Sequence, residues 1–296
     1  MSLPIEKITG MIPPVITTFR EDGSIDEGRI IREMDYVLDA GVHGLSVSGS
    51  TGEGPTLRDE ELRELIGIAR SRVKPGQPVV CGIMRTCTRD AVRAGLVARE
   101  AGADAIMVTP TAYNVLVPDE EGMFQFYSTI SKEVGLPVII YNVIPQNTIQ
   151  PRLFHRLLDE TEFVRGIKQS VGGVPALYAM KMEVGDRGML YAATDDMLAT
   201  CFDLGANGAI SAVLAVFPKQ CVAMWDASQR GDHAAARAIQ DKLYFAWQCI
   251  AGNQFPIRLK YALSVMGRDP GFCRSPIVHL SEEEKRSIEK AFEHLK

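Results

Sequence analysis

The chain has 296 residues, 46% of them hydrophobic and 23% charged, which is ordinary for a globular protein with one large or two smaller domains. Its net charge of −5 argues against a nucleic-acid partner, and no apolar run is long enough to span a bilayer. The N-terminus lacks the apolar run of a signal peptide, and the six cysteines include no close Cys-x-x-Cys pair. We therefore expect a cytoplasmic protein with free thiols.

A helix-to-strand junction recurs along the chain. It appears over residues 40–47, 101–108 and 204–211. In each copy a glycine (Gly41, Gly102 or Gly205) ends a helical pattern, where a left-handed residue is favoured. A short apolar strand follows. Strands that are apolar on both faces and alternate with amphipathic helices predict a parallel sheet covered by helices.

Eight strands are expected in this way. Their ranges are 13–18, 44–48, 78–82, 105–109, 137–142, 163–169, 189–193 and 208–212. Eight strands with intervening helices predict a (β/α)₈ TIM barrel, with a doubly wound open sheet as the alternative. The open sheet is disfavoured because the first βα turn lacks the dinucleotide-binding glycine fingerprint.

Several helix boundaries can also be predicted. Residues 24–27 have the form of a capping box, and Thr56 and Thr88 are candidate caps for the next two helices. After residue 211 the pattern is helical, over 215–229, 233–250, 256–266 and 281–295. This is too much for one closing helix, so we expect a barrel over 1–230 and a C-terminal helical appendage over 231–296.

In such a barrel, functional residues gather at the C-terminal ends of the strands. The glycine-rich segment 49–54 follows the second strand, where Gly49 and its neighbours can present backbone N–H groups to an anion and Ser50 and Thr51 add hydroxyl donors. Pro55 stands where a phosphate-binding P-loop requires lysine, so a carboxylate is the better guess. A simple βα turn is the alternative.

Lys168 ends the apolar sixth strand, a costly place for a charge. Burial favours the neutral amine, which is the form that attacks a ketone to make an imine. The alternative is a lysine in a buried ion pair or facing solvent at the mouth of the barrel.

Two tyrosines also follow strands. Tyr141 ends the fifth strand and could carry protons for imine chemistry, although an aromatic core residue is the commoner case. Tyr113, in the loop after the fourth strand, is equally well explained as an interface or turn residue.

Together these segments resemble the dihydrodipicolinate synthase / N-acetylneuraminate lyase family, over nearly the whole chain. The matching segments are 10–19, 49–53, 56–57, 109–114, 141–143, 166–168 and 208–211. The resemblance implies a class I lyase that forms a Schiff base with pyruvate or another 2-keto acid and needs no metal or organic cofactor.

The resemblance also implies roles for individual residues. Lys168 matches the imine-forming lysine, and Tyr141 matches the tyrosine that relays protons. Ser50 matches the hydroxyl of that relay, where the synthases usually have threonine. Thr51 matches the residue whose hydroxyl and backbone N–H hold the keto-acid carboxylate.

Two further matches concern the pocket and the assembly. Ile210 matches a residue whose backbone carbonyl faces the pyruvate pocket. Tyr113 matches a tyrosine that reaches into a neighbouring subunit's site. We therefore expect a homodimer or homotetramer.

The segment after Tyr141 departs from the family pattern. The synthases carry an arginine there that binds the carboxylate of the aldehyde substrate, whereas this chain has Gln146 and Asn147 and no arginine. Neither side chain supplies the charged fork of arginine. Gln146 and Asn147 instead offer amide donors that suit sugar hydroxyls, with Asn147 as the candidate binding residue, unless another arginine such as Arg85 replaces the missing one.

The leading hypothesis is therefore a lyase acting on a 2-keto-3-deoxy sugar acid, with Thr194, Asp195 and Asp196 as further candidates for binding hydroxyls. The alternatives are a synthase that condenses pyruvate with aspartate semialdehyde and a non-catalytic barrel that binds a keto acid. A metal-dependent aldolase is disfavoured because the histidines are not grouped at strand ends. They are His43, His155, His233, His279 and His294.

Overall fold

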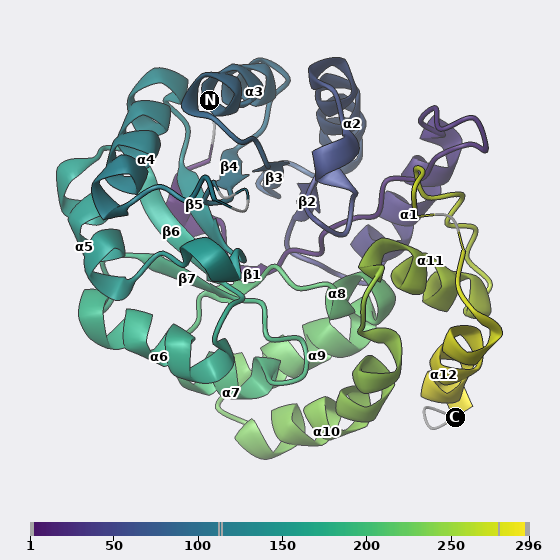
Figure 1. Cartoon of the computed structure of the whole chain (residues 1–296). Helices are drawn as coiled ribbons and strands as arrows, with labels where there is room; N and C mark the ends of the chain where they lie inside the picture. Colours follow the sequence, from purple (N-terminus) through teal and green to yellow (C-terminus); the bar gives the residue numbers. More distant parts are fainter. Residues whose placement is uncertain (1–2, 112, 114, 278, 294–296) are drawn as a thin grey trace.

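The computed structural model of the chain describes residues 3–111, 113, 115–277 and 279–293, and its eight strands form one parallel sheet surrounded by helices (Figure 1). The strands are β1 (Gly10–Met11), β2 (Leu45–Val47), β3 (Val79–Ile83), β4 (Ala105–Val108), β5 (Val138–Asn142), β6 (Val164–Gln169), β7 (Met189–Ala192) and β8 (Gly208–Ala209). The sheet runs from β1 through β8 and back to β2, and a parallel bridge between Pro14 and Ser46 closes it. The predicted (β/α)₈ barrel is confirmed.

The first strand is not where the apolar pattern predicted it. The ladder with β8 uses Gly10 and Met11, and the predicted range 13–18 contributes only the isolated bridge at Pro14. Pro13 and Pro14 have no N–H to donate to a neighbouring strand. The Pro13 carbonyl accepts from Ser46, and the next free amide, that of Val15, donates back to the Ser46 carbonyl at 2.8 Å.

Twelve α-helices are present in the described part of the chain. They are α1 (Glu27–Asp39), α2 (Asp59–Arg72), α3 (Thr88–Glu100), α4 (Glu120–Val134), α5 (Pro151–Glu160), α6 (Gly173–Val184), α7 (Leu198–Asp203), α8 (Val213–Val216), α9 (Pro218–Gln229), α10 (His233–Ile250), α11 (Phe255–Val265) and α12 (Glu282–Glu293). Short 3₁₀ turns occupy Ile5–Lys7, Gly54–Thr56 and Pro145–Asn147. The end of the last predicted helix, with His294, lies outside the described residues.

The junction glycines have the conformation that the sequence predicted. Gly41, Gly102 and Gly205 have φ angles of 88°, 95° and 89°, the left-handed region that ends a helix. Other boundaries differ. Asp26, not Ser24, caps α1 by accepting from the Arg29 amide, because the Ser24 hydroxyl turns back to Asp22.

Two further helix boundaries differ from the predicted ones. The helix predicted to start near Thr56 begins at Asp59, because residues Gly54–Thr56 form a 3₁₀ turn first. The helix predicted over 215–229 is interrupted before Pro218, which starts α9, since proline cannot continue the hydrogen-bond ladder of a preceding helix.

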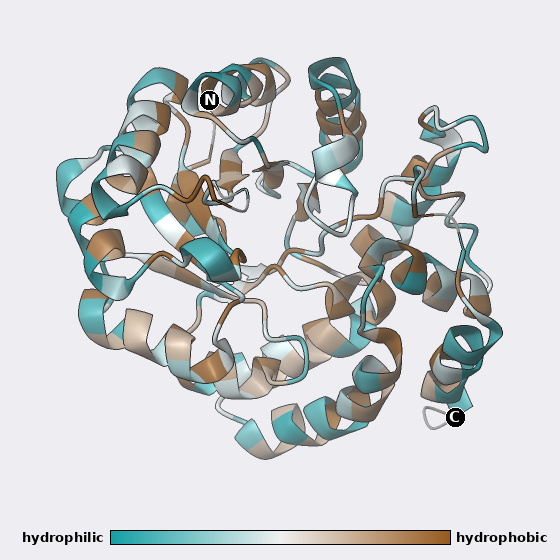
Figure 2. Cartoon of the chain, viewed as in Figure 1, coloured by the Kyte–Doolittle hydropathy of each residue, from teal (hydrophilic) through white to brown (hydrophobic). Residues whose placement is uncertain are grey.

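The core has an inner and an outer layer. Met107, Ile139, Tyr141, Tyr191 and Ile210 belong to a cluster that fills the barrel interior, while alternate strand residues pack outward against the helices. Figure 2 shows the apolar strands at the centre and the polar helix faces outside. This alternation places Lys168 on the interior side, since its neighbour Ile167 belongs to the outer cluster.

The C-terminal helices pack against the barrel wall rather than standing apart (Figure 1). Helix α9 contacts β1, α10 contacts α7, α9 and α12, and α11 contacts α8 and α12. Within the described residues, none of the helices has the length and apolar character needed to cross a bilayer.

Candidate active site

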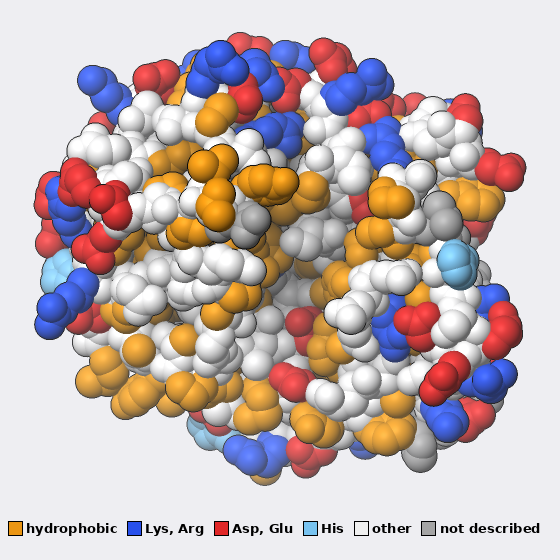
Figure 3. Space-filling view, in the orientation of Figure 1, with side chains coloured by type: hydrophobic (Ala, Val, Ile, Leu, Met, Phe, Trp, Pro, Cys, Tyr) orange, Lys and Arg blue, Asp and Glu red, His pale blue; other side chains and the backbone are white. Residues whose placement is uncertain are grey.

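A cavity of about 360 Å³ opens at the C-terminal ends of the strands. Its lining comes from the segments after β2, β5, β6, β7 and β8, together with α10 and α11. The face seen in Figure 3 is hollowed near its centre. A larger cavity of about 590 Å³, with Leu3, Arg70 and Arg99 in its wall, lies at the N-terminal ends of the strands. The cavity at the C-terminal ends is the candidate site, because functional residues of such barrels lie at that face. Lys168, Tyr141 and Ser50 all line it.

Lys168 lies in the wall of the first cavity and is only 5% exposed. The register of β5 and β6 aligns it directly with Tyr141, and β7 aligns it with Tyr191 on its other side. Its Nζ lies over the face of the Tyr141 ring, 3.7 Å from the centroid. The lysine is therefore held between two aromatic neighbours with its amine at the cavity.

The hydroxyl of Tyr141 continues this arrangement toward the loop after β2. It lies 3.1 Å from the Ser50 Oγ, a hydrogen bond in which either oxygen can donate. Ser50 also contacts the Met84 sulfur at 4.0 Å. Lysine, tyrosine and serine thus meet in one cavity, and the two hydroxyls are in hydrogen-bond contact.

The loop that carries Ser50 is a tight turn. The amides of Gly52 and Gly54 both donate to the Gly49 carbonyl at 3.0 Å, and the Thr17 hydroxyl donates to the Gly52 carbonyl at 2.7 Å. A Cβ on Gly54 would lie 2.0 Å from the Ser48 carbonyl oxygen, so only glycine fits there.

Two predicted binding residues of this region also reach the cavity. Thr51 is buried and contributes to the lining, and Ile210, directly after β8, does the same. Gly49 lies outside the lining and serves as the acceptor that closes the turn.

Asp195 adds a carboxyl group to the cavity. Its Oδ1 accepts hydrogen bonds from the Ser211 hydroxyl at 2.6 Å and from the Val213 amide at 2.7 Å. Desolvation raises the pKa of this carboxyl above its usual range, and the two hydrogen bonds and the charge of Lys168 oppose that shift. Asp196 is turned away and accepts from Gln248. Asp195 is therefore the one of this acidic pair that faces the site.

The remaining predicted site residues lie elsewhere. Asn147 is buried, but its amide donates to the Thr111 carbonyl at 2.6 Å and it does not line the cavity. Tyr113 is 70% exposed, and Asn114 lies outside the described residues. Arg85 is bound to Asp59 and the Leu57 carbonyl. It is not among the lining residues either.

One wall of the cavity was missed by the sequence reasoning. Trp247 and Ala251 line it from the end of α10, and Phe255 lines it from the start of α11. The Trp247 and Phe255 rings pack edge to face, with centroids 5.9 Å apart. The spacing of Trp247 and Ala251 by one helical turn is the only sequence signal, and it is the same for any buried helix face.

A barrel with a buried lysine at a strand end, beside a tyrosine and a serine that are hydrogen-bonded together, has the parts of an imine-forming lyase. The amine can condense with a ketone, and the hydroxyl pair can move protons to and from the adduct. Among the described residues, no group of three or more His, Cys, Asp or Glu side chains is arranged to hold a metal ion.

Comparison with known proteins leads to the same class. Residues 7–295 match the model of the dihydrodipicolinate synthetase family. A 4-hydroxy-tetrahydrodipicolinate synthase of Bartonella quintana is 31% identical over 290 residues, covering 97% of this chain and 98% of the relative. The chain belongs to the dihydrodipicolinate synthetase family and is a class I lyase.

Solved structures agree closely with this fold. YagE, a prophage protein of this family from Escherichia coli K12 in complex with pyruvate, is 29% identical, covers 97% of this chain and 98% of its own, and superposes with a TM-score of 0.91. The synthase of Acinetobacter baumannii complexed with pyruvate is 27% identical with the same coverage and TM-score.

Proposed function

We propose that this protein forms an imine between Lys168 and pyruvate or a related 2-keto acid, and that its physiological substrate is a 2-keto-3-deoxy sugar acid. The observation that carries the proposal is the cavity itself. It joins Lys168, Tyr141 and Ser50 to Asp195, and the described residues that line it include no arginine.

The proposed chemistry follows from these groups. The neutral amine of Lys168 attacks the C2 carbonyl, and water leaves as the C2=N bond forms. When the C4 hydroxyl loses its proton, the C3–C4 bonding electrons flow into the protonated imine, releasing an aldehyde and leaving an enamine. Protonation of the enamine at C3 gives the imine of the shorter 2-keto acid. Hydrolysis of that imine releases this product and frees Lys168.

Other groups hold the substrate and move its protons. We assign the proton transfers to Tyr141 and Ser50, whose oxygens are in hydrogen-bond contact. Thr51 and the backbone around Ile210 are assigned to the carboxylate end of the keto acid, because both line the cavity together with Lys168.

The choice of a sugar acid rests on the part of the cavity lined by Asp195 and Ser211. A carboxylated aldehyde bound there requires a cation, and Arg85 is already engaged with Asp59 and the Leu57 carbonyl. Ser211 donates its proton to one oxygen of Asp195, which leaves the second carboxyl oxygen of Asp195 and the lone pairs of Ser211 Oγ to accept hydrogen bonds from a hydroxylated chain. We assign hydroxyl binding to this pair in place of Asn147, whose amide is bound to Thr111.

A synthase that condenses pyruvate with aspartate semialdehyde is the second candidate, because relatives of about 30% identity carry that name. Steady-state kinetics with both substrate classes separates the two. We expect measurable cleavage or dehydration of at least one 2-keto-3-deoxy sugar acid and weak condensation with aspartate semialdehyde. A wide preference in kcat/KM for aspartate semialdehyde would restore the synthase, and imine formation without turnover of any substrate would favour a keto-acid-binding protein.

The assembly is proposed from the loop after β4. Tyr113, Val115 and Leu116 are 70%, 85% and 69% exposed, an unusual concentration of exposed apolar side chains in one loop. We propose that this loop packs against a second copy of the chain, in a homodimer or homotetramer, with Tyr113 completing the partner's site.

A further inference from the structure

A buried ion pair joins two walls of the cavity. The Lys260 Nζ lies 2.7 Å from Oε1 of Glu53, and the two side chains are 3% and 2% exposed. Glu53 closes the loop that carries Ser50 and Thr51, whereas Lys260 lies in α11, the helix whose first residue, Phe255, lines the cavity. The pair therefore connects the loop that carries Ser50 and Thr51 to the C-terminal helices.

Both partners are held by further hydrogen bonds. The Lys260 amine also donates to the Phe272 carbonyl, and Oε2 of Glu53 accepts from the Arg274 amide at 2.9 Å. Glu53 itself has a φ of 55°, a left-handed conformation that is uncommon for this residue type. A backbone held in that conformation needs surrounding contacts to maintain it.

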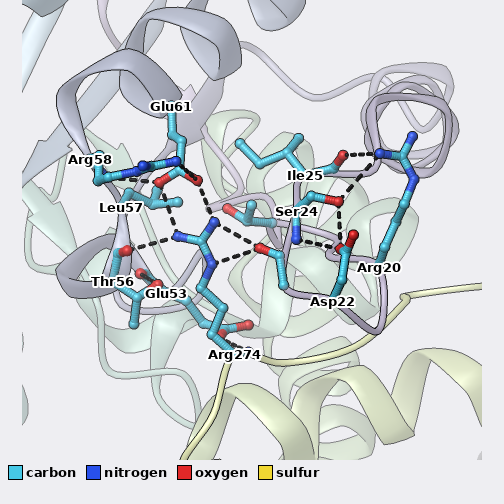
Figure 4. Close-up of polar contacts among 12 residues, drawn as sticks. Arg20, Asp22, Ser24, Ile25, Glu53, Thr56, Leu57, Arg58, Glu61 and Arg274 are labelled. Carbon is cyan, nitrogen blue, oxygen red and sulfur yellow. Dashed lines mark hydrogen bonds and ion pairs between the residues drawn. The ribbon is translucent and has the colours of Figure 1, made fainter.

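Arg274 anchors the same C-terminal segment at a second point (Figure 4). Its guanidinium lies between the Glu61 carboxylate and the carbonyls of Thr56 and Gly23. The segment 53–61 leads from the loop that carries Ser50 into α2. It contacts Lys260 or Arg274 at three points, which are Glu53, Thr56 and Glu61.

We propose that Glu53 and Lys260 are positioning residues for the reaction: their ion pair sets the place of Ser50 and Thr51 relative to Lys168, and it makes the C-terminal helices part of the active site. This inference rests on the proposed function of that cavity. Neither charge can move away without being left buried and unpaired, so the pair fixes the loop more tightly than apolar contacts would.

A double variant tests this inference. Glu53→Gln with Lys260→Met removes both charges, so no unpaired charge remains to unfold the protein. The matched control is Glu33→Gln with Arg268→Met, which removes another buried ion pair, between α1 and the segment after α11, whose residues do not line the cavity. The measurement is the pyruvate concentration that gives half-maximal borohydride trapping on Lys168, alongside Tm.

We expect the Glu53/Lys260 double variant to need on the order of 10- to 100-fold more pyruvate, because a small displacement of the loop weakens substrate positioning. The control should lose stability to a similar extent without that shift. Unchanged half-saturation in the double variant, or an equal shift in the control, would overturn the inference.

Two further outcomes are informative. If the double variant does not fold, Lys260→Arg keeps the charge but cannot place a compact amine between Glu53 and the Phe272 carbonyl. It should raise the half-saturating concentration at least roughly threefold, and no shift would count against the inference. Failure to trap any adduct on Lys168 in the unmodified protein would instead refute the proposed function.

Discussion

The amine of Lys168 lies 3.7 Å from the centre of the Tyr141 ring, above its face and not beside its hydroxyl. The hydroxyl is directed to Ser50, 3.1 Å away. The two parts of the tyrosine therefore make separate contacts: the ring lies against the lysine amine, and the oxygen is hydrogen-bonded to Ser50. This division allows the two roles to be tested independently.

The first prediction concerns the lysine. Borohydride with pyruvate should trap a covalent adduct on Lys168, and Lys168→Arg should abolish turnover because a guanidinium stays protonated and cannot form the imine. Mass spectrometry of the trapped protein checks the adduct, and a steady-state activity assay checks the loss of turnover. Lys181→Arg, at a surface ion pair with Asp186, is the control that should trap normally. An adduct on another residue would refute the mechanism.

The second prediction concerns the tyrosine hydroxyl. Tyr141→Phe keeps the ring under Lys168, so pyruvate trapping should persist while kcat falls by roughly 10²–10⁴, the usual loss for a positioned acid–base group. Tyr191→Phe is the matched control, because Tyr191 flanks Lys168 on the other side and its hydroxyl donates to the Ile8 carbonyl. That variant should lower Tm and leave kcat nearly unchanged. A near-normal kcat for Tyr141→Phe would reduce Tyr141 to a packing residue.

The third prediction concerns the exposed loop. If Tyr113 completes a partner's site, light scattering should show that the smallest active species is a dimer, and Tyr113→Ala should lower kcat. Tyr178→Ala, at an exposed tyrosine on α6, is the control. A fully active monomer, or an equal loss in both variants, would contradict the proposed role of Tyr113.

The fourth prediction concerns acid stability. The hydrogen bond from Arg274 is the largest cause of the lowered pKa of Glu61, which falls from 4.5 to about 2 against the opposing effect of burial. A lowered folded-state pKa stabilises the protein above the unfolded value, and this stability is lost as pH falls from about 4.5 through about 2. Its size is on the order of 3 kcal/mol.

Glu61→Gln should therefore lower the free energy of unfolding at neutral pH and flatten its dependence on pH between about 4.5 and 2. Denaturant unfolding at several pH values measures both effects. Glu121→Gln, which removes an exposed pair with Arg156, is the control and should change little. If the free energy of unfolding changed with pH in parallel for Glu61→Gln and the unmodified protein, the lowered pKa of Glu61 would be refuted.

The barrel and the reactive centre could be predicted from local patterns. The junction glycines and the apolar strands between helices specify βα units, because each signal depends only on residues close together in the chain. Lys168 and Tyr141 could be recognised because they interrupt or end apolar strands, and parallel strands of a barrel bring their C-terminal ends together. The sequence by itself therefore determined the fold class, and together with the family resemblance it nominated Lys168 and Tyr141 as candidate site residues.

Only the tertiary structure decided how the rest of the cavity is built. Trp247 and Phe255 face the site because α10 and α11 fold back over the barrel, and Glu53 meets Lys260 across some two hundred positions of sequence. Asn147 turned out to hold the Thr111 carbonyl, and Asp195 rather than Asp196 faces the cavity. No local pattern encodes such choices, because the direction of a side chain at a strand end depends on which distant groups compete for its hydrogen bonds.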